Sequence, residues 1–390
     1  MKKFYIALLS LSLSIIALML ACTSHITFAK TEFDNISAKS YIIMDSSGNV
    51  LIDKNADEKH EVASICKLMT TLITLEYLDK NAFTLEDEFV ASSYACSMEG
   101  SQAFLDANSK YKVRDLIKSV IVASANDSAV VLAENIAGSE NTFVDMMNKK
   151  AKELGMNNTL YANSTGLHDG TQYSTARDTA ILLDKVSKYD LYKEDCKIWL
   201  DKLVHPSGRE TELVNTNRLV KYYPYCKTGK TGFTDEAGYC LSSTASKNNL
   251  DLTCVVLGCD TMANRFKESI VLYNYAFANF VSDMVANKND FLENNIKVVG
   301  GKTTSVKIQV QDDYYVTQNR NNKKEITTKL VLPSSIKAPL KTGDVVGEYQ
   351  VIADGKVLKT IPVIVANDVQ KQSYKDVLNK IIKDYPVFNN

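Results

Sequence analysis

The first pair of residues in this chain that could do chemistry together is Ser64 and Lys67, in the string Ser-Ile-Cys-Lys. A serine hydroxyl becomes a strong nucleophile when a base removes its proton, and a lysine amine is such a base when burial or nearby positive charge lowers its pKa. Residues three apart on a helix share one face, so the spacing suits this pairing. A single S-x-x-K match remains weak, because it arises by chance in most chains.

Two further motifs follow in an order that suits acyl transfer. Ser124-Ala125-Asn126 offers a second hydroxyl, which can relay a proton to a leaving amine, and an amide that can hold the substrate. Lys230-Thr231-Gly232 offers a positive charge and a hydroxyl for a substrate carboxylate. Together the motifs predict an enzyme in which Ser64 attacks a carbonyl and Lys67 accepts the serine proton.

The string at residues 226–234, CKTGKTGFT, contains Lys-Thr-Gly twice. Side chains alternate along a strand, so lysines three residues apart point to opposite faces and only one can face a site. Lys227 follows closely on Pro224, where we expect the chain to be turning still. We therefore predict that Lys230 belongs to the working triplet. A phosphate loop is excluded, because G-x-x-x-x-G-K-[ST] needs glycine where this chain has Pro224.

The composition excludes several other kinds of site. The chain has four histidines and no G-x-S-x-G string, so a Ser-His-Asp hydrolase is not supported. Neither H-E-x-x-H nor C-x-x-C occurs, and we expect no metal and no cofactor. The formal net charge is −1 and there is no tract rich in lysine and arginine, so we expect no nucleic-acid partner.

The elements that must position these motifs are predicted as helices followed by strands. The apolar run from Ser64 to Leu78 predicts a buried helix whose positive N-terminal end lies at Ser64. A hairpin is expected before it, and helices on both sides of the Ser-Ala-Asn break. Strands and a last helix complete this part, and short β-rich runs from about residue 294 predict a separate domain. The expected ranges are 39–45 and 49–53 for the hairpin, 113–122 for the helix before the break, 238–245 and 250–258 for the strands, and about 263–286 for the last helix.

The N-terminal residues predict export. Lys2 and Lys3 precede an apolar run at residues 4–20, and the small-x-small string at 27–29 is typical of a signal-peptidase site. We expect cleavage before Lys30; a retained membrane helix and lipidation at Cys22 are the alternatives. Seven cysteines would remain, an odd number that cannot all pair, so we expect mostly buried free thiols.

The C-terminal residues, 370–390, predict an amphipathic helix. One face is apolar and lysines surround it, so the tail could lie on an anionic membrane surface or else dock on its own domain. The apolar positions are Tyr374, Val377, Leu378, Ile381, Ile382 and Tyr385.

Beyond the short motifs, the chain resembles the low-molecular-weight penicillin-binding proteins, specifically the serine-type D-Ala-D-Ala carboxypeptidases of peptidase family S11. The similarity extends over about residues 35–385, and the continuation T-x-x-A-G-Y follows the second Lys-Thr-Gly copy, not the first. The similar blocks include KSYIIMDSSGNVLIDKNADEKHEVASICKLMT, SANDSAVVLAENIAG, STGLHDGTQYSTARD and KTGFTDEAGYC.

The resemblance implies an α+β fold of the β-lactamase/transpeptidase type, with helices on both sides of an antiparallel sheet and a small all-β C-terminal domain. The implied segments are a signal peptide at 1–29, the catalytic domain at 30–290, the β domain at 294–366 and the tail at 370–390. It also implies removal of the terminal D-alanine from peptidoglycan pentapeptide stems through an acyl-Ser64 intermediate, with β-lactams acylating the same serine. The expected location is the outer face of the cytoplasmic membrane or the cell wall.

The resemblance also assigns residue roles. Ser64, Lys67 and Ser124 are expected to be catalytic, and the backbone N–H groups of Ser64 and Phe233 are expected to form the oxyanion hole. Phe233 stands where the family often has His or Tyr, and Cys66 where it often has Thr. The expected substrate-binding residues are Asn126, Lys230, Thr231 and Gly232.

Two alternatives share these motifs. A class A serine β-lactamase needs an E-x-x-L-N loop, and the nearest string here, at residues 210–215, has the wrong spacing and lies too close to the Lys-Thr-Gly strand. A catalytically silent wall-binding homologue would have lost motif residues, and all of them are present.

Overall fold

The computed structural model describes residues 33, 35–293 and 295–384 of the chain. The expected signal peptide, Cys22 and Tyr385 lie outside these residues. Among the described residues, no helix combines the length and the apolar character needed to cross a membrane.

The part of the chain before residue 280 is organised around a five-stranded sheet in the order β2-β1-β9-β8-β7. Every neighbouring pair of strands is antiparallel. The first two strands form the predicted hairpin, which is confirmed. The bounds are Ser40–Asp45 for β1, Val50–Lys54 for β2, Cys226–Thr234 for β7, Gly238–Lys247 for β8 and Leu250–Cys259 for β9.

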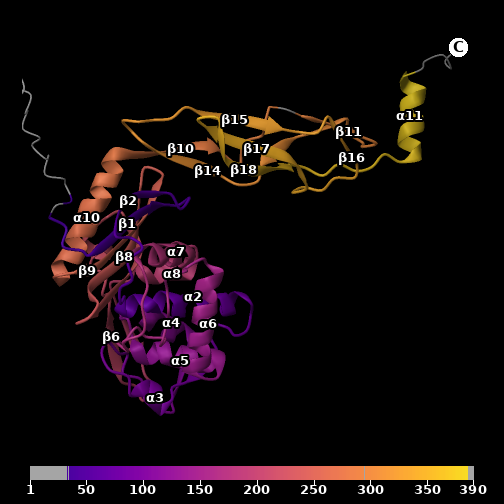
Figure 1. Ribbon diagram of the computed structural model, residues 1–390. Helices are drawn as coiled ribbons and strands as arrows, with labels where there is room; N and C mark the ends of the chain where they lie inside the picture. The colour runs from indigo at the N-terminus through magenta and orange to yellow at the C-terminus, as the bar shows by residue number, and fades with distance from the viewer. Residues whose placement is uncertain (1–32, 34, 294, 385–390) are drawn as a thin grey trace, which may run out of the picture.

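Helices cover both faces of this sheet, as the resemblance implied (Figure 1). Successive residues of a strand point to opposite faces, and the two cores divide accordingly. Ile43 and Val256 pack with Tyr273 of α10 (Met262–Asn279) on one face. Ile42 and Val255, their neighbours in sequence, belong to the larger core on the other face, which most of the remaining helices build.

This second face carries a helical region that extends away from the sheet (Figure 1). This region also contains two short antiparallel strand pairs, β3 with β4 and β5 with β6. The helices are α2 (Lys67–Asp79), α3 (Ser93–Cys96), α4 (Val113–Val122), α5 (Asn126–Ala137), α6 (Glu140–Glu153), α7 (Ala176–Val186) and α8 (Asp190–Cys196). The short α9 (Leu219–Tyr222) instead contributes Leu219 to the core that contains α10. The short strands are β3 (Glu88–Val90), β4 (Lys110–Lys112), β5 (Leu200–Val204) and β6 (Glu210–Val214).

The last helix before residue 280 is shorter than predicted. We expected it to reach about residue 286, but α10 ends at Asn279 and residues Phe280–Ala286 form strand β10. β10 pairs antiparallel with β14 (Tyr314–Asn319). The prediction was wrong because a short apolar run fits the periodicity of a helix as well as that of a strand. Here the segment becomes a strand because it pairs with another strand nearly thirty residues further along the chain.

The C-terminal part is all β up to its final helix. A four-stranded sheet in the order β13-β18-β17-β15 carries most of it, and a three-stranded sheet in the order β12-β11-β16 lies toward the far end (Figure 1). The strands are β11 (Ile296–Val299), β12 (Ser305–Val306), β13 (Ile308–Val310), β15 (Ile326–Val331), β16 (Ser335–Lys337), β17 (Val345–Ala353) and β18 (Lys356–Val365).

The predicted tail helix is α11 (Tyr374–Asp384), at the far end of the C-terminal domain (Figure 1). Ser373 and Asp376 cap its first turn reciprocally: the Asp376 N–H donates to the Ser373 hydroxyl, and the Ser373 N–H donates to the Asp376 carboxylate. Its apolar side chains remain exposed, from 40% at Val377 to 85% at Tyr374. The helix therefore does not bury this face against its own domain.

Candidate active site

Ser64 lies on a tight turn that runs directly into a buried helix. Residues Ala63–Cys66 form a 3-10 turn, η1, and the α-helix proper begins at Lys67, later than the predicted start at Ser64. Ala63 has φ 47°, a left-handed conformation that a non-glycine residue rarely adopts. Such strained positions cluster at functional sites, where the surrounding structure holds them.

Lys67 reaches Ser64 from the first turn of α2. Its Nζ lies 2.8 Å from the Oγ of Ser64 and donates to the carbonyl oxygen of Thr165 at 2.5 Å. The side chain is fully buried, and this burial lowers the pKa of Lys67 from its ordinary 10.5 to about 7. A large fraction of the amine is therefore neutral near neutral pH, with a lone pair available for the Ser64 proton.

Ser124 and Lys230 form a second hydroxyl–amine pair. The Nζ of Lys230 donates to the Oγ of Ser124 at 2.7 Å and to the carbonyl oxygen of Thr231 at 3.0 Å. Ser124 lies in the break between α4 and α5 with φ 62°, which turns its side chain out of the helical path. Burial, reinforced by the charge of Lys67, lowers the pKa of Lys230 well below its ordinary value. The site thus holds two buried amines that repel each other when both are protonated.

Asn126 lines the cleft and carries an unsatisfied polar atom. Its Nδ2 donates to the carbonyl oxygen of Glu99 at 2.5 Å, but its Oδ1 is buried with no hydrogen-bond partner among the described residues. Leaving a buried acceptor unpaired costs about 1–3 kcal/mol. A substrate amide N–H that donates to this oxygen would recover that cost, so the residue is poised to bind a peptide.

The loop at residues 97–109, called here the cleft loop, forms one wall of the site. Gly100 and Ser101 line the cleft, and the carbonyl oxygen of Ser101 accepts the backbone N–H of Asn126 at 2.7 Å. The carboxylate of Asp127, the next residue, accepts the N–H groups of Ala103 at 3.0 Å and Leu105 at 3.1 Å. The segment that supplies Ser124 and Asn126 therefore also fixes this wall.

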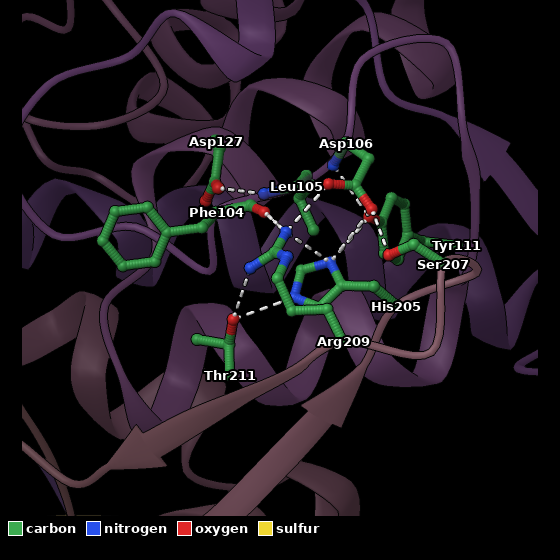
Figure 2. Close-up of polar contacts among 9 residues, drawn as sticks. All are labelled: Phe104, Leu105, Asp106, Tyr111, Asp127, His205, Ser207, Arg209 and Thr211. Carbon is green, nitrogen blue, oxygen red and sulfur yellow. Dashed lines mark hydrogen bonds and ion pairs between the residues drawn. The ribbon is translucent and has the colours of Figure 1, made fainter.

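The β5–β6 hairpin holds the cleft loop from the other side (Figure 2). Arg209, in the hairpin turn, donates to the carbonyl oxygen of Phe104 at 2.5 Å and to the carboxylate of Asp106 at 2.8 Å. Beside it, the Nδ1 of His205 lies 2.8 Å from the Tyr111 hydroxyl. Burial, together with the charge of Arg209, lowers the pKa of His205. The ring therefore packs beside Arg209 as a neutral side chain and not as a second cation. None of these residues was predicted to serve the site.

Strand β7 forms the opposite wall of the cleft. Gly232 comes so close to the turn that carries Ser64 that a side chain there would clash with the backbone carbonyl of Val62. The hydroxyl of Thr231 donates to that of Thr216 at 2.7 Å. Phe233 is 47% exposed and stacks on Tyr239 with ring centroids 4.3 Å apart. Its side chain thus packs on the neighbouring strand β8. The oxyanion role of the backbone N–H groups of Phe233 and Ser64 stays a prediction.

The structure separates the two Lys-Thr-Gly copies as the alternation predicted. Lys230 is buried in the site, whereas Lys227 is exposed and lines a different cavity together with Lys188 and Lys197. Only the second copy reaches Ser124.

The predicted residues come together in one cleft of about 390 Å³. Lys67 and Lys230 lie beneath it and reach it through their contacts with Ser64 and Ser124. The predicted residues that line it are Ser64, Ser124, Asn126, Thr231, Gly232 and Phe233.

The sequence reasoning missed Arg265, which α10 contributes to the same cleft. The side chain is 6% exposed, its Nη1 donates to the carbonyl oxygen of Gly232 at 3.1 Å, and its Nε has no partner among the described residues. Burial lowers the pKa of Arg265. A buried guanidinium beside the Lys-Thr-Gly strand is suited to bind a carboxylate. The sequence did contain a signal for Arg265, because this arginine lies on the apolar face of a predicted helix.

Two acidic side chains surround His168, which follows the cleft residue Leu167 in sequence. The Nδ1 of His168 lies 2.9 Å from both carboxylate oxygens of Glu61, which raises the pKa of His168. Glu236 completes a group whose ligand-type atoms lie within 4.8 Å of one another. The group is largely exposed, and an ion pair explains its geometry.

Cys66 lies between Ser64 and Lys67 in the sequence but points away from them. Its Sγ contacts the carbonyl oxygen of Asn163 and the side chain of Gln172, and burial raises its pKa to about 12. It packs as a small buried side chain, as expected. All seven described cysteines are free, and five of them are buried.

Comparison with known proteins agrees with this site. The family model for D-alanyl-D-alanine carboxypeptidase matches residues 27–261, and that for the C-terminal domain of penicillin-binding protein 5 matches residues 280–371. The chain is 34% identical over 385 residues to D-alanyl-D-alanine carboxypeptidase DacF of Bacillus subtilis, covering 97% of this chain and 99% of that protein.

Solved structures show the same similarity. Penicillin-binding protein 5 from Haemophilus influenzae matches with a TM-score of 0.69 at 31% identity, over 86% of this chain and 98% of that one. A peptidoglycan synthesis regulatory factor (PBP3) from Streptococcus pneumoniae matches with a TM-score of 0.73 at 25% identity, over 86% of this chain and 100% of that one. The chain belongs to the family of D-alanyl-D-alanine carboxypeptidases.

Proposed function

We propose that the protein removes the terminal D-alanine from peptidoglycan pentapeptide stems by a serine acyl-transfer mechanism. The observation that carries the proposal is the 2.8 Å contact between Ser64 and the fully buried Lys67. Lys67 takes the hydroxyl proton as the Ser64 Oγ attacks the carbonyl carbon of the scissile amide. The proton then passes, with Ser124 as relay, to the leaving amine, and the C–N bond breaks. Water hydrolyses the acyl-Ser64 ester to complete the cycle.

The rest of the site recognises the substrate. The terminal carboxylate lies against Lys230, Thr231 and Arg265, and the unpaired Oδ1 of Asn126 accepts a substrate amide N–H. A β-lactam carries an equivalent carboxylate next to its reactive carbonyl, so it acylates Ser64 as well. No described feature favours the alternative of a β-lactamase.

The proposed location is the outer face of the cytoplasmic membrane. The exposed apolar side chains of α11, with lysines on either side, suit the surface of an anionic bilayer. We propose that residues 1–29 are a signal peptide that directs export of the chain.

The test is D-alanine release from a synthetic pentapeptide, with and without penicillin, by wild type and Ser64→Ala. We expect release by wild type, its loss in penicillin, and neither release nor penicillin labelling by Ser64→Ala. Penicillin labelling that survives in Ser64→Ala would show that another residue is the nucleophile. Rapid loss of the label from wild type would instead favour a β-lactamase.

A further inference from the structure

The carboxylate of Glu140 accepts three hydrogen bonds from two other segments of the chain. Glu140 is the first residue of α6, where the helix dipole favours a negative charge. Its Oε1 accepts the backbone N–H of Ser164 at 2.9 Å and the hydroxyl of Ser164 at 2.6 Å. Its Oε2 accepts the hydroxyl of Tyr94, in α3 directly before the cleft loop, at 2.8 Å. The proposed acyl transfer does not use this carboxylate, so its contacts need another explanation.

The contacts with Ser164 hold a tight turn at residues 163–166, called here the Asn163 turn. The Asn163 Oδ1 accepts the N–H of Gly166 at 2.7 Å, which closes the turn. A side chain at Gly166 would clash with the carbonyl oxygen of Ala63, so the turn lies directly against η1. A shift of the Asn163 turn therefore also reaches the segment that carries the proposed nucleophile.

The other side of the Asn163 turn is hydrogen-bonded to α2. The carbonyl oxygen of Thr165 accepts a hydrogen bond from the Nζ of Lys67 at 2.5 Å. The carbonyl oxygen of Ser164 accepts one from the hydroxyl of Thr70 at 2.7 Å. Lys67 and Thr70 are three residues apart, so they present both donors from one face of the helix. Glu140 thus holds the N–H side of the turn, and α2 holds its carbonyl side.

We infer that Glu140 is a positioning residue for acylation: through the Asn163 turn it holds the Lys67 amine at hydrogen-bond distance from Ser64. The inference rests on the proposed function, because it takes Lys67 as the base. Without the carboxylate, the N–H and the hydroxyl of Ser164 lose their acceptor and must be hydrated, so water enters beside the turn. The turn then no longer fixes the lysine amine in one orientation, and proton transfer from the serine slows.

Glu140 acts on Lys67 by position and not by charge. Burial is the main cause of the lowered pKa of Lys67, and the titratable groups that act on this pKa are Cys66, its neighbour in sequence, and Asp127 of α5. The charge of Lys67 in turn lowers the pKa of Lys230, which faces the site from β7. Glu140 is not among these groups. Water that enters beside the turn lessens the desolvation and therefore raises the pKa of Lys67.

The test measures acylation by penicillin across pH 5–9 by stopped flow, together with kcat and KM for D-alanine release. For Glu140→Ala, we expect the acylation rate at pH 7 to fall about tenfold and the midpoint of the acid limb to rise by about one pH unit. KM should stay within about twofold of wild type, because Glu140 does not line the cleft. Glu140→Gln keeps an oxygen for Ser164 and an amide N–H for the Tyr94 oxygen, so it should restore the rate and the midpoint to nearly wild-type values.

Two further variants separate positioning from general damage to the fold. Asp145→Ala removes an exposed carboxylate from the same helix and should leave both the rate and the midpoint unchanged. Ser164→Ala removes one of the three hydrogen bonds to Glu140 and should lower the rate about threefold. This second variant keeps the inference testable if Glu140→Ala does not fold.

The outcomes separate the inference from the proposed function. Acylation of Glu140→Ala at the wild-type rate across the pH range would overturn the inference, and so would a wild-type rate in Ser164→Ala. If Glu140→Gln is as slow as Glu140→Ala, the charge of the carboxylate matters and not its hydrogen bonds, which contradicts the inference. A rise in KM with an unchanged acylation midpoint would show that Glu140 supports only the cleft wall. A wild-type protein that penicillin does not label would refute the proposed function itself.

Discussion

The ammonium of Lys230 and the hydroxyl of Ser124 meet at 2.7 Å across 106 residues of sequence. This contact joins the sheet to the helical region at the point where the cleft opens between them. It also places Ser124, the proposed proton relay, next to Lys230, which is proposed to bind the substrate carboxylate. The contact of Ser64 with Lys67, the proposed nucleophile and base, is by contrast local and spans three residues.

The first prediction separates the two Lys-Thr-Gly copies. Lys230→Ala should lower kcat/KM for D-alanine release by at least about a hundredfold, because it removes a buried charge from the carboxylate site and leaves Ser124 without its partner. Lys227→Ala, the matched control three residues earlier, should stay within about twofold of wild type, because Lys227 is exposed outside the cleft. The opposite ranking in steady-state assays would refute the choice of copy.

The second prediction concerns pH. Because burial lowers the pKa of Lys67 to about 7, the base is mostly protonated below that pH and cannot accept the Ser64 proton. The rate of acylation by penicillin should therefore rise about tenfold per pH unit on the acid side and level off above about pH 7. Stopped-flow labelling across pH 5–9 measures this. A rate that does not change across the range would exclude Lys67 as the base.

The same pKa has a consequence for stability. Between about pH 7 and 10 the unfolded chain, with an ordinary lysine pKa, binds more protons than the folded protein, so Lys67 should make the free energy of unfolding increase with pH. Denaturant titrations of wild type and Lys67→Met measure the contribution. The pH dependence should be weaker in the variant, and equal slopes would contradict the assignment.

The third prediction tests how the cleft loop is held. Arg209→Ala removes the contacts to Phe104 and Asp106, so the wall formed by Gly100 and Ser101 should become mobile. We expect KM for the pentapeptide to rise several-fold, with a loss of stability of at most about 1 kcal/mol, because Arg209 is partly exposed. Lys202→Ala, which removes an exposed ion pair of the same hairpin, is the control. Equal effects of the two variants on KM would show that the loop does not depend on Arg209.

The fourth prediction tests the tail. Truncation after Gln372 removes α11 but keeps Val369, which is buried in the C-terminal domain. The truncated protein should lose its binding to vesicles that contain anionic lipid and keep its rate of D-alanine release. Leu378→Glu with Ile381→Glu should act in the same way, whereas Asn379→Glu on the polar face should have a much smaller effect. Vesicle sedimentation measures binding, and a truncated protein that still sediments would show that another segment is the anchor.

The sequence by itself determined the local chemistry. Ser64 and Lys67 share one turn, so their contact follows from spacing on a helical path, and an apolar run around them predicts the burial that lowers the lysine pKa. Alternation along β7 likewise distinguished Lys230 from Lys227. The covered antiparallel sheet, the C-terminal β domain and the amphipathic tail helix also followed from patterns and from the resemblance.

Only the tertiary structure decided what depends on distant partners. Arg265 reaches Gly232 because α10 packs across the sheet, and its position on the apolar face of a predicted helix does not reveal which residue it will contact. Arg209 contacts the cleft loop over more than 100 residues of sequence. The unpaired oxygen of Asn126 is a property of its surroundings, and the strand at 280–286 depends on pairing with β14. Periodicity records which face of an element is buried, but the partner that buries it is fixed only when the chain folds.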